Sequence, residues 1–81
     1  MKIAAIRKAA EKITKRYGMP APIVEKANGN PDGKSGYNGV QIRSELTLDE
    51  GGMELSAAIE KIDPAYICES QGGCVYFVYR P

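Results

Sequence analysis

The fold is decided by residues 65–80, in which two strand-like runs flank a glycine turn: Ala65-Tyr66-Ile67-Cys68-Glu69-Ser70, Gln71-Gly72-Gly73 and Cys74-Val75-Tyr76-Phe77-Val78-Tyr79-Arg80. Two runs of this kind around a tight glycine turn predict a β-hairpin. The second run is apolar or aromatic on both faces, which favours an interior strand over an exposed edge. Alternation places Val75, Phe77 and Tyr79 on one face and Tyr76 and Val78 on the other.

Two amphipathic helices are predicted before this hairpin. The first covers residues 2–17, ends at Gly18 and Pro20, and has an apolar stripe at helical spacing, formed by Ile3, Ile6, Ala10, Ile13 and Tyr17. The second begins either at Leu48, with Thr47 and Glu50 as a capping box, or near Met53, because each glycine of Gly51-Gly52 costs about 1 kcal/mol in a helix. It ends at Asp63, since the residue before a proline avoids the helical region. Its apolar face contains Leu48, Leu55, Ala58, Ile59 and Ile62.

Two further strands are expected at residues 23–26 and 39–44. The polar, glycine-rich residues 27–36 between them predict a mobile loop. The element order is therefore α-β-β-α-β-β. Two helices on one face of an antiparallel sheet of about four strands bury both apolar stripes, which predicts an α+β two-layer sandwich. At 81 residues, the chain is expected to form a single small globular domain over 1–81.

The net charge of +1 hides a strong division between the two halves of the chain. Residues 1–43 contain nine Lys and Arg but three Asp and Glu, and residues 44–81 contain two and seven, so the halves carry formal charges of +6 and −5. Such asymmetry indicates a charged partner.

No catalytic or metal-binding constellation is recognisable. Without histidine, neither a Ser/His nor a Cys/His dyad can form, and two cysteines do not make a usual zinc site. Gly33-Lys34-Ser35 match the end of a P-loop, but Asn28 stands where the first glycine belongs. Residues 28–33 partly match a calcium loop, but Gly39 replaces its bidentate glutamate. The sequence therefore predicts no enzyme activity, no metal and no cofactor.

Cellular setting is inferred from the same composition. The apolar runs are too short to span a membrane, and charges at Arg7, Lys8, Glu11 and Lys12 interrupt any signal-peptide region. We expect a cytoplasmic protein in which Cys68 and Cys74 are reduced, with a cross-link across the hairpin as the alternative.

The leading hypothesis is a small binding module that acts on a protein partner, such as a stoichiometric inhibitor or adaptor of the type found in phages and mobile elements. Its predicted contact surface is an acidic face formed by Glu45, Asp49, Glu50, Glu54 and Glu60. A homodimer is another form of this hypothesis: the basic half of one copy meets the acidic half of another, or residues 37–44 pair edge to edge.

The alternative hypothesis is nucleic-acid binding through the basic face of the first helix. An outward-pointing Tyr76 would add a stacking contact. The predicted contact residues are Lys8, Lys12, Lys15, Arg16 and Tyr76.

Overall fold

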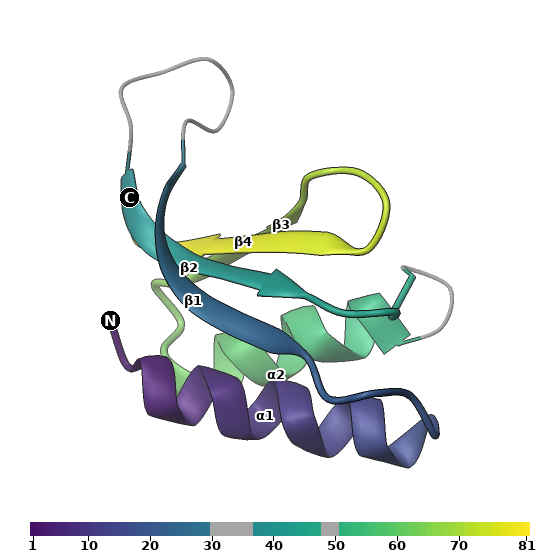
Figure 1. The fold of residues 1–81 in the computed structure, drawn as a ribbon. Helices are drawn as coiled ribbons and strands as arrows, with labels where there is room; N and C mark the ends of the chain where they lie inside the picture. Colours follow the sequence, from purple (N-terminus) through teal and green to yellow (C-terminus); the bar gives the residue numbers. More distant parts are fainter. Residues whose placement is uncertain (30–36, 48–50) are drawn as a thin grey trace.

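The computed structural model describes residues 1–29, 37–47 and 51–81. Along the chain these residues form α1 (Ile3–Arg16), β1 (Ile23–Gly29), β2 (Tyr37–Arg43), α2 (Met53–Ile62), β3 (Ile67–Ser70) and β4 (Val75–Tyr79) (Figure 1). The predicted α+β fold and the order α-β-β-α-β-β are confirmed. Residues 27–29 of the predicted loop belong to β1, and the rest of that loop lies outside the described residues.

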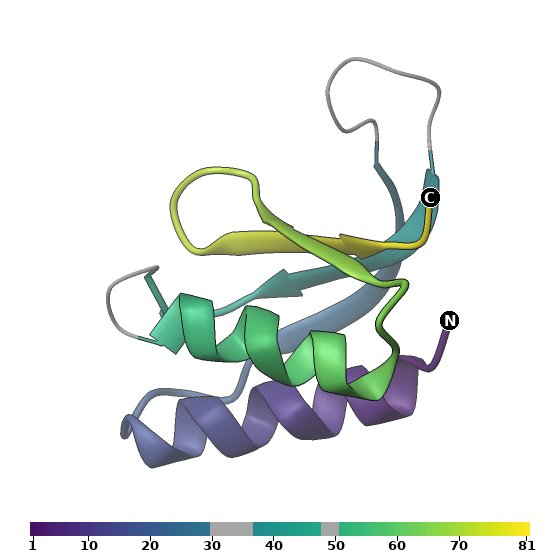
Figure 2. The ribbon, with the colours of Figure 1, turned by 180° about the vertical axis from the view of Figure 1, so that it is seen from behind.

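The four strands form one antiparallel sheet in the order β1-β2-β4-β3, and both helices lie on the same face of it (Figures 1 and 2). β2 pairs with β1 on one side and with β4 on the other. The prediction that residues 37–44 form an open strand is therefore wrong. The chain returns through α2 and places β4 between β2 and β3, because a strand that is apolar on both faces is most stable in the interior. Among the described residues, β1 and β3 are the outer strands, and each has one free edge.

α1 follows the predicted apolar stripe. Ile6, Ala10 and Ile13 are buried, and the helix ends where Gly18 adopts the left-handed conformation with φ of 69°. Tyr17 lies just beyond the last helical turn and is 46% exposed, so it does not extend the buried stripe.

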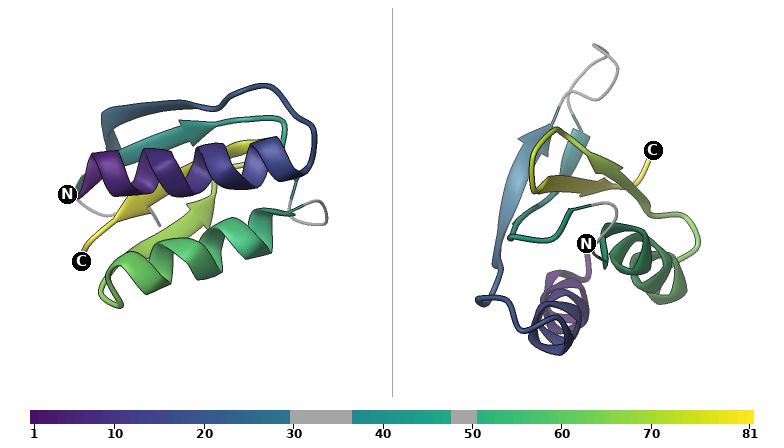
Figure 3. Two further views of the ribbon diagram at one scale, coloured as in Figure 1. Left: turned by 90° about the horizontal axis from the view of Figure 1, so that it is seen from below. Right: turned by 90° about the vertical axis from the view of Figure 1, so that its right-hand side faces the viewer.

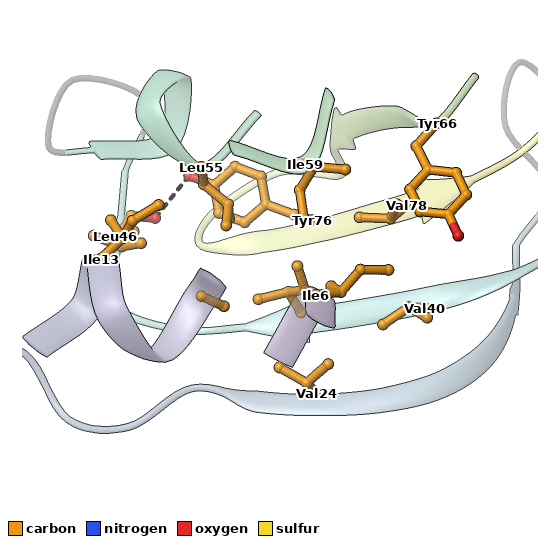
Figure 4. Close-up of a cluster of buried hydrophobic side chains, with 12 residues drawn as sticks. Ile6, Ile13, Val24, Val40, Leu46, Leu55, Ile59, Tyr66, Tyr76 and Val78 are labelled. Carbon is orange, nitrogen blue, oxygen red and sulfur yellow. Dashed lines mark hydrogen bonds between the residues drawn. The ribbon is translucent and has the colours of Figure 1, made fainter. Parts of the chain in front are cut away.

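Tyr76 faces the helices and is 1% exposed (Figure 4). Its hydroxyl donates a hydrogen bond of 2.9 Å to the Leu46 carbonyl. The prediction that Tyr76 points outward is wrong, because the helices cover the sheet face that carries Tyr76 and Val78. Phe77 and Tyr79 lie on the opposite face, where their rings stack with centroids 5.5 Å apart and both side chains are buried.

α2 begins at the later of the two predicted starts, and the glycines before it have a packing role. A Cβ at Gly52 would lie 2.4 Å from the Tyr76 hydroxyl oxygen and 2.9 Å from the Thr47 carbonyl oxygen. Gly51 has φ of 111°, which side chains rarely tolerate. Glu50 of the predicted capping box lies outside the described residues. α2 ends as predicted, with Asp63 extended before Pro64.

Candidate protein-binding groove

The division of charge along the sequence becomes a division in space. α1 packs beside β1 and α2 beside β3, so the basic first half lies toward one edge of the sheet and the acidic second half toward the other (Figure 3). Among the described residues, Arg16–Glu54 is the one ion pair that joins the halves; the other, Arg43–Glu25, lies within the first half. The halves therefore leave most of their charges facing solvent.

The predicted acidic residues are distributed over several surfaces. Glu54 lies between the helices, where it pairs with Arg16. Its carboxylate also accepts a hydrogen bond from Tyr17, which together with its charge raises the pKa of that tyrosine. Glu45 is exposed beside Pro20 and Ile23, and Glu60 lines a separate groove. Asp49 and Glu50 lie outside the described residues.

The groove at Glu60 lies between α2 and the edge strand β3 and has a volume of about 290 Å³. α2 contributes Met53, Ser56, Ala57 and Glu60, and β3 contributes Cys68 and Ser70; Gly52 and Tyr76 complete the described lining. Met53 is 75% exposed although it is large and apolar. The described lining of the groove therefore combines an accessible apolar side chain, small polar side chains and the Glu60 carboxylate. Among these residues, sequence reasoning named Glu60 as part of an acidic face and Tyr76 as an outward stacking residue. It missed the other six, which share no motif.

Cys68 forms part of the groove wall as a protonated thiol. Burial and the nearby Glu69 carboxylate raise the pKa of this thiol from 9.0 to about 11. At neutral pH it therefore behaves as a small apolar side chain rather than as a nucleophile. Cys68 and Cys74 are both free cysteines in the structure.

The predicted basic residues of α1, Lys8, Lys12, Lys15 and Arg16, are all exposed. Lys12 and Arg16 also line a cavity of about 350 Å³ between the helices, together with Lys61 of α2. Lys61 was missed because it belongs to the acidic half of the sequence. Tyr76 does not join this group, because it lies in the core.

A larger cavity of about 530 Å³ opens where β1 and β2 meet the N-terminus. Its described lining consists of Met1, Lys26, Ala27, Asn28, Asn38 and Gly39. These side chains include no carboxylate, thiol or hydroxyl group, so this part of the lining offers no acid–base pair for catalysis.

Two further findings concern the residues that the structure describes. No three or more His, Cys, Asp and Glu side chains gather there in a way that would hold a metal ion. Neither α1 nor α2 has the length and apolar character that crossing a bilayer requires.

Comparison with protein-family models, curated proteins and solved structures finds no match to the chain.

Proposed function

We propose that the protein is a non-catalytic binding module that holds a basic segment of a protein partner in the groove between α2 and β3. The observation that carries this proposal is the composition of the groove: Met53 offers apolar contact, and Glu60 offers a negative charge at the same opening. Stoichiometric inhibitors and adaptors, the types predicted from the sequence, act through contacts of this kind.

The position of the groove supports a basic partner. The groove lies toward the edge of the sheet that the acidic half of the chain forms. This half also contains Asp63 and Glu69. These charges attract a cationic segment during encounter, and burial of apolar groups against Met53 then stabilises the complex. A volume of about 290 Å³ is at the lower end for a small-molecule site, but an open groove of this size suits a few side chains of a peptide.

Glu60→Lys is expected to weaken the binding of basic peptides about fivefold or more, because it replaces attraction with repulsion at the groove. A random heptapeptide library displayed on phage is selected on the immobilised protein. Fluorescence anisotropy then gives the dissociation constants of the enriched peptides for the wild type and the variant. We expect the enriched peptides to contain Lys or Arg together with apolar residues.

Glu45→Lys is the matched control, because it makes the same change of charge at an exposed glutamate outside the groove. It is expected to change affinity less than twofold or so, as is usual for an exposed charge that is not in contact with the peptide. Equal affinities for both variants, or enrichment of no basic peptide, would contradict the proposal.

Nucleic-acid binding through α1 is the second candidate. The observation that favours it is the exposed stripe of Lys8, Lys12 and Lys15, none of which has an ion-pair partner in the described part of the chain. Three phosphate contacts predict that affinity for duplex DNA falls roughly 40-fold between 50 and 200 mM salt. Anisotropy with labelled duplex DNA measures this slope. If Lys12→Glu with Lys15→Glu leaves the affinity and the slope unchanged, this candidate is wrong.

A further inference from the structure

We infer that the partner segment binds as an added β-strand on the free edge of β3, an inference that rests on the function proposed above. Extended peptides add to sheet edges in many complexes, where main-chain hydrogen bonds give affinity and alternate side chains give specificity. β3 has β4 on one side, and no strand of the described residues lies on its other side. The groove between α2 and β3 opens at this edge.

The hydrogen-bond pattern identifies which main-chain groups of β3 face the free edge. The Gln71 N–H donates to the Val75 carbonyl at 2.8 Å, so Gln71 points toward β4. Antiparallel strands alternate, and the register therefore directs Glu69 and Ile67 toward β4 as well. The N–H and C=O groups of Cys68 and Ser70 point the other way, toward the free edge.

A second contact gives the same assignment independently. The Ser44 N–H donates to the Cys74 carbonyl at 3.1 Å, so the main chain of residue 74 faces β2. Alternation then directs Tyr76 and Val78 toward β2, and Phe77 and Tyr79 toward β3. Phe77 and Tyr79 are the register partners of Glu69 and Ile67. The contacts of β4 with β3 and with β2 thus agree that the main-chain groups of Cys68 and Ser70 face outward.

The same two residues also line the groove with their side chains. A strand added beside β3 therefore places the side chains opposite Cys68 and Ser70 on the helix side, against Met53 and Ala57. The side chain between them lies on the other face, beside Glu69. This arrangement favours a peptide that has short apolar residues opposite Cys68 and Ser70. It also favours Lys or Arg where the peptide passes Glu60 and Glu69.

The other free edge of the sheet is less suited to strand addition. The Arg7 guanidinium donates to the Val24 carbonyl at 3.0 Å, which occupies an acceptor on the edge of β1. In the described part of the chain, no side chain bonds to the main chain of Cys68 or Ser70 in this way. The occupant that fits β3 is a basic extended segment of another protein, since its charge complements Glu60 and Glu69. A second copy of this chain is an outcome that the test distinguishes.

The test uses a heptapeptide selected from the displayed library, synthesised in two N-methylated forms. One form is methylated at residues 3 and 5, and the other at residues 2, 4 and 6. In an added strand only every second N–H bonds to β3. One form is therefore expected to bind at least about tenfold more weakly than the unmodified peptide, and the other about as well.

Ser70→Pro supplies a test from the protein side. It removes an N–H at the free edge but none that bonds to β4, a position where proline is tolerated in an edge strand. We expect at least about tenfold weaker peptide binding. Ser70→Ala keeps the N–H and is the matched control. If the proline variant unfolds, the methylated peptides still decide the question.

The outcomes separate this inference from the proposed function. Equal effects of both methylation patterns, with Glu60→Lys still weakening binding, overturn strand addition and leave the groove as the binding site. No peptide binding at all overturns both. If light scattering shows a dimer of the free protein and Ser70→Pro dissociates it, the occupant is a second copy, and the inference of a different protein is wrong.

Discussion

Tyr76→Ala is expected to lower the free energy of unfolding by about 3–5 kcal/mol, the cost of deleting a large buried aromatic side chain. Tyr76 lies between the sheet and α2, is 1% exposed, and bonds to Leu46. An 81-residue domain has a total stability of about 4–12 kcal/mol, so the variant loses much of its margin or unfolds. Urea denaturation followed by circular dichroism measures the loss.

Tyr76→Phe separates the ring from its hydroxyl. It retains the packing but removes the donor to the Leu46 carbonyl, which is expected to cost about 1–3 kcal/mol. Wild-type stability of Tyr76→Ala would mean that the side chain points to solvent, as the sequence alone suggested, and would contradict the arrangement of the core.

Gly39→Ala is expected to destabilise the fold by about 3 kcal/mol, at the upper end of the range for overpacking. A Cβ at Gly39 would lie 2.2 Å from the Val78 carbonyl oxygen and 2.7 Å from the Phe77 ring. The carbonyl belongs to the central strand β4 and cannot move without disturbing both neighbours. Thermal and urea denaturation of the variant measure the effect.

Gly73→Asn is the control for this substitution. Gly73 has φ of 57°, and a Cβ there would meet no heavy atom within 4 Å. Asparagine is among the few residues that visit this region, so we expect a loss below about 1 kcal/mol. A loss for Gly39→Ala no larger than that of the control would contradict the close approach of β2 and β4.

Local sequence signals were sufficient for the elements themselves. The apolar stripe before Gly18 predicts α1, the turn at Gly72-Gly73 predicts the β3–β4 hairpin, and Pro64 predicts the end of α2. Each depends on residues close together in the chain. The division of charge was visible in the sequence. It remains in the folded protein because each αββ half lies toward its own edge of the sheet.

The features that depend on distant residues were not predicted. Both faces of β4 are apolar, so alternation alone does not say whether Tyr76 or Phe77 faces the helices. The pairing of β2 with β4 and the edge position of β3 are equally non-local. The groove results from that edge position, which brings Met53 and Cys68 to one opening. Of the predicted acidic residues that the structure describes, only Glu60 lines the groove, and only the fold distinguishes it from Glu54.

Amide hydrogen exchange at Cys68 and Ser70, followed by NMR with and without the selected heptapeptide, tests the free β3 edge most directly. In the free protein these two amides are expected to exchange quickly, and those of Ile67 and Glu69 slowly, because only the latter bond to β4. Saturation with the peptide is expected to slow Cys68 and Ser70 at least about tenfold. Unchanged exchange at both, with chemical-shift changes confined to α1, would contradict the account and place the peptide on the basic helix instead.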